Sequence, residues 1–404
     1  MIRKIFNLKD FIFQTSSLIF AGVITFLINI IIFRQNDLNL YSEFSFAISL
    51  GYILAIIIDA GSRNLILIRV PDPLHKKDKN FIYKIIFQSF LIFFLLSIFS
   101  IFFLDIKYFL IIINFFLINT CQQISFLFKA RGNFYNDFIW QIFFRTSNFI
   151  FIIYGLTYIN KNISTILILW SISSLISIII YLNLNFINFF KIRNEIFVFI
   201  KDHLSKFVLP LFLIDLFISI NLRSNVILME YLNFNDEDIS YFAAAFRVFE
   251  IILIIFSPIA IFAIRYFSKN EILINSLFKL LFQCIMFGSI IFIFFYFSSN
   301  FITNLLYKDI DQNISPILKF LTVSYIFILP STILCQYFLS KKKHIILSFV
   351  FVISYSVSLV TNYYLLNIYS IYGAVYTLVI FEFIIFIVLT FILVKFILYE
   401  KNRY

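Results

Sequence analysis

Long apolar segments, separated by short polar ones, make up most of the chain. About twelve of them are long enough for a helix that crosses a bilayer, which needs about 20 residues. Connections such as 104–107 leave room for little more than a turn, so neighbouring helices must run antiparallel. The pattern predicts an all-α polytopic membrane protein with about 12 transmembrane helices. The expected spans are roughly 11–33, 44–68, 81–103, 108–128, 138–159, 163–186, 208–229, 241–264, 277–299, 315–338, 345–366 and 371–395.

Composition excludes a soluble globular protein. Of the 404 residues, 62% are hydrophobic and 13% are charged, and a soluble core cannot absorb that much apolar surface. The three cysteines, Cys121, Cys284 and Cys335, lie in apolar runs without paired spacing. We expect these cysteines to fill space in the protein interior and not to form disulfides or bind a metal ion. We therefore expect neither a metal site nor a bound cofactor.

The net charge of +11 could point to nucleic acid, but membrane topology explains it better. Cytoplasmic loops of membrane proteins collect Lys and Arg. With the N-terminus inside, almost all basic loop residues fall on the cytoplasmic side. The opposite side keeps Arg34, Lys107, Lys161 and Lys308 together with the acidic loop 230–238. We therefore expect both termini in the cytoplasm of a bacterial plasma (inner) membrane and no nucleic-acid partner.

The spans divide into two sets of six. Between them, apolar and charged residues of the segment 190–207 recur at helical spacing, which predicts an amphipathic helix on the cytoplasmic membrane surface. A faint repeat sets "YSEFSFA" (41–47) against "ISYFAAA" (239–245), each at the outer start of the second helix of its half. Two related halves are typical of transporters. The expected parts are an N-terminal lobe at 1–189, a linker at 190–207 and a C-terminal lobe at 208–404.

Polar residues form stripes along several of the apolar spans. The second span carries Asp59 and Arg63 one helical turn apart, although a charge at the bilayer centre costs about 2.5–3.5 kcal/mol. Stripes on helices of both halves predict a shared polar cavity. The other stripes are Ser17, Ala21, Thr25 and Asn29; Gln141, Arg145 and Asn148; Asp215, Ser219 and Arg223; Arg247, Glu250 and Ser257; and Ser354, Ser358 and Asn362.

Four arginines are the candidate substrate-binding residues: Arg63, Arg145, Arg223 and Arg247. Arginine stays charged at any accessible pH, and its planar fork suits phosphate oxygens. Two of the four come from each half, which indicates an anionic, phosphate-bearing cargo. An alternative stays open, because small polar residues also mediate helix packing and Asp59–Arg63 or Arg247–Glu250 could be neutralised pairs without a substrate role.

Three segments resemble the bacterial polysaccharide-export flippases. "IIIFRQNDLNLYSEFSFAISLGYILAIIIDAGSRNLILIR" resembles the opening of that family. In order, it has an apolar helix, an Arg, a short loop, an aromatic residue and a second helix that ends in Asp-x-Gly. "ISYFAAAFRVFEIILIIFSPIAIF" and "LVTNYYLLNIYSIYGAVYTLVIFE" resemble two later motifs of that family. The chain is thus similar to O-antigen repeat-unit flippases of the Wzx type, in the superfamily of MATE exporters. The chain differs from the family at Ser42, where the family usually has glycine. Its total of seven glycines is also low for the family.

The resemblance implies two six-helix bundles in a V that opens alternately to each side of the membrane. Its members move an undecaprenyl-pyrophosphate-linked oligosaccharide from the inner to the outer leaflet. On this reading the arginines contact the pyrophosphate or acidic sugars. The acids that balance them, or couple transport to a proton or sodium gradient, are Asp59, Asp215, Glu250 and Glu382. The implied partners are the lipid-linked oligosaccharide, membrane lipids, a polysaccharide polymerase and a chain-length regulator.

Three other readings remain. A MATE-type cation-coupled drug or metabolite antiporter would carry an acid within its first helix, and here Asp10 lies at the edge of that span. A major-facilitator transporter would place the "DAGSR" motif in a basic loop, but Asp59 precedes the apolar "NLILI". A membrane polymerase or ligase would need converging catalytic groups on a sizeable outer loop. The outer loops are short, so we expect a transporter and not an enzyme.

Overall fold

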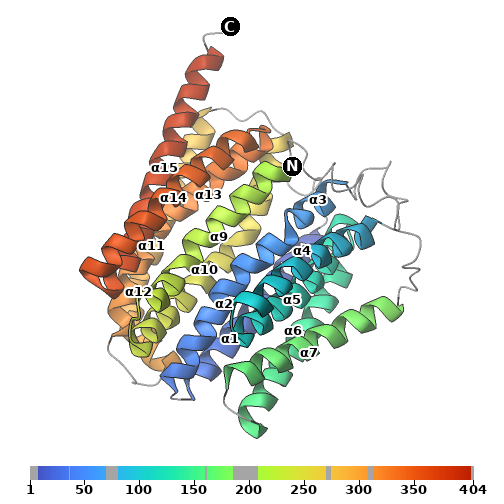
Figure 1. Cartoon of the computed structure of the whole chain (residues 1–404). Helices are drawn as coiled ribbons and strands as arrows, with labels where there is room; N and C mark the ends of the chain where they lie inside the picture. Colours follow the sequence, from blue (N-terminus) through green and yellow to red (C-terminus); the bar gives the residue numbers. More distant parts are fainter. Residues whose placement is uncertain are drawn as a thin grey trace. The chain divides into compact units, whose positions relative to one another are not determined.

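The computed structural model describes residues 8–35, 37–69, 81–159, 162–184, 208–269, 274–307 and 313–401. All regular structure in these residues is helical (Figure 1). Among the residues that the structure describes, eleven helices are long and apolar enough to cross a membrane, and a twelfth span results when α12 and α13, bent by 42° at a short break, are taken together. The predicted all-α polytopic membrane protein with about twelve transmembrane helices is thereby confirmed.

The chain divides into two compact units. Unit 1 comprises Met1–Ile32 and Glu43–Leu216, and unit 2 comprises Phe33–Ser42 and Phe217–Tyr404. The segment 33–42, which runs from the last residue of α1 into the first residues of α2 and is called the loop 33–42 below, thus belongs to unit 2, and the first residues of α9 belong to unit 1. The expected linker at 190–207 lies outside the described residues, so the predicted lobe boundaries stay predictions.

Unit 1 is built around α5. This helix packs against α3, α4, α6 and α7. Of the 18-residue apolar stretch that qualifies it as a membrane span, 72% is buried, compared with 28% for the corresponding stretch of α4. A span buried on most sides can carry polar residues without exposing them to lipid. The helices of unit 1 are α1 (Leu8–Phe33), α2 (Leu38–Asp59), α3 (Ser62–Arg69), α4 (Phe81–Phe103), α5 (Ile106–Ala130), α6 (Phe134–Tyr158) and α7 (Ile163–Leu184).

Unit 2 packs its helices in neighbouring pairs. α14 lies against α15, and α13 contacts α10, α11 and α15. The break between α12 and α13 falls at Val323 and Ser324. The helices of unit 2 are α9 (Val208–Tyr231), α10 (Asp236–Lys269), α11 (Ile274–Tyr307), α12 (Ile314–Thr322), α13 (Tyr325–Ser340), α14 (His344–Tyr369) and α15 (Ile371–Lys401).

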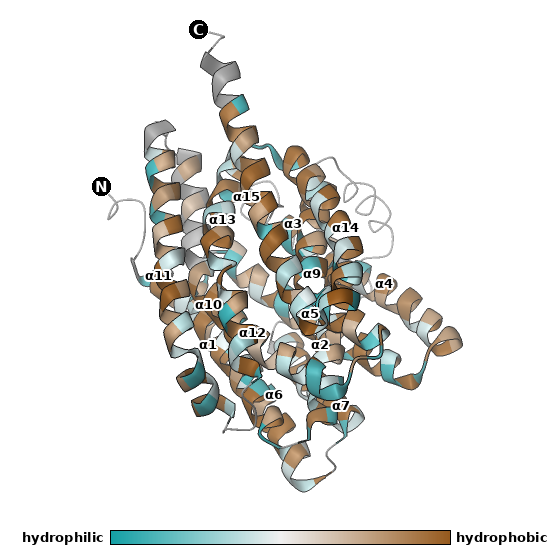
Figure 2. Cartoon of the chain, turned by 90° about the vertical axis from the view of Figure 1, so that its left-hand side faces the viewer, coloured by the Kyte–Doolittle hydropathy of each residue, from teal (hydrophilic) through white to brown (hydrophobic). Residues whose placement is uncertain are grey.

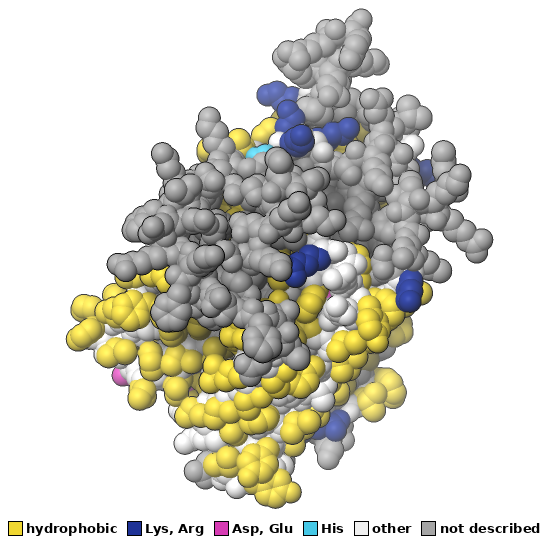
Figure 3. Space-filling model, turned by 90° about the vertical axis from the view of Figure 1, so that its right-hand side faces the viewer, with side chains coloured by type: hydrophobic (Ala, Val, Ile, Leu, Met, Phe, Trp, Pro, Cys, Tyr) yellow, Lys and Arg dark blue, Asp and Glu magenta, His cyan; other side chains and the backbone are white. Residues whose placement is uncertain are grey.

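The outer faces of the helices are apolar. Colouring by hydropathy shows long hydrophobic stretches on the described helices (Figure 2), and hydrophobic side chains cover most of the described surface in Figure 3. On α11, for example, Phe294, Phe297 and Phe301 are exposed. Exposed aromatic and aliphatic side chains over the length of a bilayer identify these faces as lipid-facing. The chain is a multi-span membrane protein.

The predicted continuous span 44–68 is wrong, because the helix breaks at Ala60 and Gly61. Both residues have positive φ angles, 47° and 79°, which end α2 at Asp59 and let α3 start at Ser62. The glycine also allows a close approach, since a Cβ at position 61 would lie 2.9 Å from Cγ1 of Val208. Glycine accepts the left-handed conformation without steric cost. Arg63 therefore stands on a separate short helix.

We expect Gly61→Ala to lower the stability of the protein. The left-handed conformation costs an L-residue with a Cβ about 1–2 kcal/mol, and the contact with Val208 adds to this. The apparent melting temperature in detergent measures the loss. Gly132→Ala is the matched control, because Gly132 has φ 76° but no atom within 4 Å of the added Cβ. Equal losses in both variants would show that the approach of Val208 is unimportant.

Candidate functional site

Asp59 joins the two halves of the broken second span. Its side chain is buried, and Oδ2 accepts a hydrogen bond from the backbone N–H of Arg63 at 3.2 Å. The same oxygen forms an ion pair with Nε of Arg63 at 3.3 Å. The carboxylate thus satisfies an N–H in the first turn of α3, which a helix itself cannot pair. Asp59 and Arg63 stay together in spite of the break.

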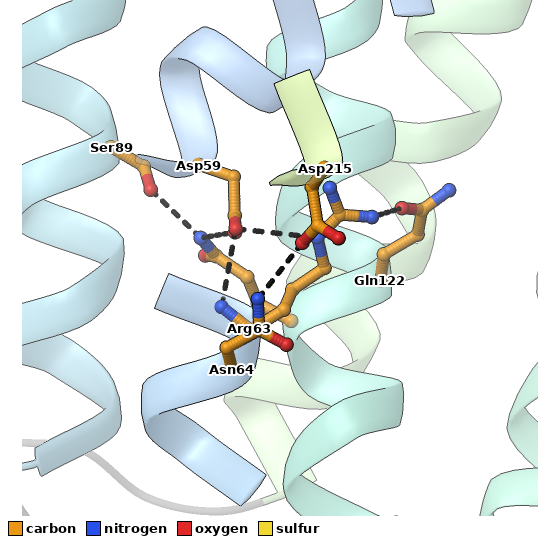
Figure 4. A network of polar contacts seen from close by, with 7 residues as sticks. Asp59, Arg63, Asn64, Ser89, Gln122 and Asp215 are labelled. Atoms are coloured by element: carbon orange, nitrogen blue, oxygen red, sulfur yellow. Dashed lines mark hydrogen bonds and ion pairs between the residues drawn. The ribbon is translucent and has the colours of Figure 1, made fainter. Parts of the chain in front are cut away.

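Two adjacent glutamines of α5 complete this network (Figure 4). Nη1 of Arg63 donates to Oε1 of Gln122 at 3.0 Å. Nε2 of Gln123 donates to Oδ1 of Asp59 at 3.1 Å and to Oγ of Ser89 on α4 at 2.8 Å. Neither glutamine was predicted from the sequence. The signal that could have found them is a pair of consecutive amides in an otherwise apolar span.

Asp215 brings a second carboxylate to the same place (Figure 4). It lies in the part of α9 that belongs to unit 1, and its Oδ2 accepts a hydrogen bond from Nδ2 of Asn64 at 2.8 Å. The ionised forms of Asp59, Asp215 and Arg63 sum to one negative charge. Arg63 is therefore compensated locally, as the packing alternative allows, and its predicted role in substrate binding stays a prediction.

Arg145, in the middle of α6, has a different environment. Its Nε lies 3.5 Å from Oε1 of Gln141, and its guanidinium lies 5.1 Å from the centre of the Phe144 ring. No carboxylate of the described residues lies within the 4.0 Å of an ion pair. Arg145 thus places a half-buried positive charge in an apolar span without a described counter-ion.

In unit 2, two arginines share one carboxylate. Glu250 on α10 forms one ion pair with Arg223 of α9 and a second with Arg247 at 2.5 Å. All three side chains are at most 15% exposed. The three charges sum to one positive charge. The sequence placed these residues in separate stripes, and the structure brings them together.

Glu382 on α15 lies apart from these arginines. It is 7% exposed, and its Oε1 accepts hydrogen bonds from Tyr355 at 3.3 Å and from Asn221 at 3.4 Å. Within the described part of the chain no Lys or Arg pairs with it. Next to it, Oγ of Ser358 donates to Oδ1 of Asn221 at 3.0 Å. An amide and a hydroxyl thus donate to a buried carboxylate, whose predicted part in ion coupling stays a prediction.

Other members of the polar stripes serve helix packing. Asn148 of α6 accepts a hydrogen bond from Ser173 of α7 at 2.8 Å. Asp137, which the sequence analysis missed, is fully buried and accepts hydrogen bonds from Ser17 and Ser125. Such contacts join α1, α5 and α6. The packing alternative therefore holds for these residues.

The predicted site residues fall into distinct clusters within each unit. Unit 1 holds the Asp59–Arg63–Asp215 network and Arg145, and unit 2 holds the Arg223–Arg247–Glu250 cluster and Glu382. The described residues contain no group of three or more His, Cys, Asp and Glu side chains that could hold a metal ion. A single cavity lined by all four arginines stays a prediction.

Comparison with solved structures identifies the fold. The chain is similar to an inward-facing multidrug resistance MATE family transporter of the MOP superfamily, with a TM-score of 0.69 and 14% identity over 92% of each chain. An outward-facing form gives 0.64 with 14% identity, over 94% of this chain and 93% of that one. A mutant of the Vibrio cholerae MATE transporter VcmN gives 0.59 with 12% identity, over 96% and 97%.

Comparison of the amino-acid sequence with known proteins identified no relative. No protein-family model matches the chain, and the search of the curated proteins found no match either. At 11–14% identity the solved structures show the fold and nothing finer. The chain therefore has the fold of MATE transporters of the MOP superfamily.

Proposed function

We propose that the protein is a flippase that moves an undecaprenyl-pyrophosphate-linked oligosaccharide from the inner to the outer leaflet of a bacterial plasma membrane by alternating access. The cargo is a repeat unit of O-antigen, capsule or exopolysaccharide. Its polar head group travels through the protein, and its lipid tail stays in the bilayer. The MATE fold, which the neighbours use for transport, supports the alternating-access part of the proposal.

The observation that carries the proposal is the environment of Arg145. A charged arginine in an apolar span costs about 2.5–3.5 kcal/mol unless a partner compensates it. Gln141 and Phe144 supply an amide and a ring face but no negative charge. A phosphate or an acidic sugar would supply the missing charge and match the planar guanidinium. The cluster of Arg223, Arg247 and Glu250, which carries one net positive charge, favours the same kind of cargo.

The nearest alternative is a cation-coupled drug or metabolite antiporter of the MATE type. The fold supports it as well as it supports a flippase, and two of the similar structures are described as multidrug resistance transporters. The part of α1 from Ile12 to Phe33 contains no Asp or Glu, and Asp10 lies in the first turn of the helix, whereas that branch couples through an acid within the first span. The excess of buried arginine also disfavours cationic drugs, because like charges repel. We therefore keep the antiporter as the second candidate.

We place the protein in the inner membrane with both termini in the cytoplasm, following the distribution of Lys and Arg. We propose that it works beside a polysaccharide polymerase and a chain-length regulator and has no enzymatic activity of its own. Glu382 and Asp215 are the acids that we propose for coupling to a proton or sodium gradient, because neither forms an ion pair with a described basic side chain within 4.0 Å. A bound cofactor is not part of the proposal.

Reconstitution into proteoliposomes tests the two candidates. The flippase proposal expects a lectin added outside to gain access to an undecaprenyl-pyrophosphate oligosaccharide that was first confined to the inner leaflet. It expects no uptake of ethidium or another cationic dye driven by a proton or sodium gradient. Dye transport without lipid translocation would overturn the proposal in favour of the antiporter. Liposomes that contain a heat-denatured sample provide the leak control.

A further inference from the structure

The loop 33–42, which includes the last residue of α1 and the first residues of α2, belongs to a different unit from the rest of these two helices. Residues 33–42 lie in unit 2, although α1 up to Ile32 and α2 from Glu43 belong to unit 1. Within unit 2 the loop contacts the end of α11 and the start of α10. The polar contacts come from Arg34 and from Leu38, and the apolar contacts from Phe33. The transport proposal assigns no role to these residues.

Arg34 caps the C-terminal end of α11. Its Nε donates to the backbone oxygen of Leu306 at 2.7 Å, and its Nη2 donates to that of Leu305 at 2.7 Å. Because α11 ends at Tyr307, both carbonyls are in the last turn, where helix carbonyls have no partner within the helix. A positive charge at this end of a helix is also favourable. The planar fork of arginine fits the two adjacent oxygens.

Aromatic packing lies beneath this polar contact. The Phe33 ring lies 5.0 Å from Tyr41 and 4.7 Å from Tyr307, and all three side chains are at most 1% exposed. The Tyr307 hydroxyl donates to the backbone oxygen of Ala244 on α10 at 3.0 Å. The three rings and the Arg34 hydrogen bonds thus link the loop to two helices of unit 2.

The two segments of the predicted internal repeat also take part in this contact. Ser240 of "ISYFAAA" donates through Oγ to the backbone oxygen of Leu38 at 2.8 Å, and Leu38 opens α2, the helix that carries "YSEFSFA". The starts of α2 and α10, the two helices that carry the predicted repeat, therefore meet within unit 2. Arg34 is exposed to solvent, so water can replace the carbonyls as its hydrogen-bond partners. The polar part of the contact can therefore open without leaving the guanidinium unpaired.

We propose that the loop 33–42 is a latch, closed in this structure, that must release before the outer side of the protein opens. The inference rests on the proposed alternating-access transport. Arg34 is a positioning residue that holds the latch shut through the last turn of α11. The buried rings set the position to which the loop returns after release.

Thiol labelling of Ser42→Cys tests the latch without any substrate. Ser42 is 1% exposed, so a membrane-impermeant maleimide reaches a cysteine at this position only when the loop opens. The measurement uses the full chain in sealed membrane vesicles of each orientation, with Cys121, Cys284 and Cys335 replaced by Ala. We expect slow labelling from the side of the loop and an about tenfold faster rate when Arg34→Ala is added, a factor that corresponds to about 1.4 kcal/mol.

Two further variants control the experiment. Lys107→Ala removes another basic residue of the same predicted side, whose partner is Glu43 at 3.2 Å, and should leave the labelling rate unchanged. Arg34→Lys keeps the charge but loses the fork and should give an intermediate rate. Equal labelling rates with Arg34 and with Ala at position 34 would overturn the latch, as would an equal rise in the Lys107→Ala variant.

The latch and the proposed cargo can fail separately. The labelling rates alone decide whether Arg34 holds the loop, because no substrate is present in that experiment. The lectin assay alone decides whether the protein moves a lipid-linked oligosaccharide. A tenfold response to Arg34→Ala in a protein that moves cationic dyes would support the latch and reject the cargo.

Discussion

Replacing Arg145 with Ala is expected, on the proposed flippase function, to reduce polysaccharide export by about thirtyfold to a hundredfold. This loss corresponds to about 2–3 kcal/mol, the range for a hydrogen bond between charged groups. The reason is that no carboxylate of the described residues lies within ion-pair distance of Arg145. Its positive charge is therefore available to bind an anionic cargo. Surface polysaccharide in cells that depend on this protein measures the effect, and immunoblotting of membranes normalises it to the amount of protein.

The matched variants separate charge from geometry. Arg145→Lys keeps the positive charge and should retain part of the export, because lysine cannot offer two parallel donors. Arg131→Ala removes an exposed arginine from the turn between α5 and α6 and should leave export unchanged. Because truncation also removes a costly charge from an apolar span, we expect the Arg145→Ala protein to be at least as abundant as the unaltered one. Full export by this variant would remove Arg145 from the cargo site.

The second large effect is expected on stability, from Glu250→Gln. The substitution keeps the shape of the side chain but leaves Arg223 and Arg247 without the carboxylate that they share. Removing one partner from a buried charged cluster costs about 3–5 kcal/mol, because the remaining charges stay buried. The apparent melting temperature of the purified protein in detergent should fall by about 5 °C or more.

A double variant tests this cause. Adding Arg247→Gln to Glu250→Gln removes one of the two uncompensated charges and should recover part of the lost stability. Glu43→Gln provides the control, since Glu43 is 35% exposed in its pair with Lys107 and such pairs contribute about 0–1 kcal/mol. If the double variant were as unstable as the sum of the two single variants, the charges would not act on one another.

The sequence alone determined that the chain crosses the membrane about twelve times as helices. Apolar runs of about 20 residues have few alternatives, because a backbone in lipid must satisfy its hydrogen bonds within a helix. The sequence also identified the charged residues in the spans, since a charge in an apolar run stands out whatever the fold. The resemblance to the export flippases led to the MATE-like fold, which the solved structures bear out.

The tertiary structure decided which of these charges are compensated. The sequence could pair Asp59 with Arg63 because they are one turn apart, but Asp215 reaches them only through the packing of α9 on α3. Likewise, Arg223 meets Glu250 across two helices, and the two positive φ angles at Ala60 and Gly61 break a run that reads as one helix. Hydrophobic periodicity records which face of a helix is buried, but not which helix covers it. Partners far apart in the chain, such as Arg34 and the end of α11, therefore become visible only once the helices have packed.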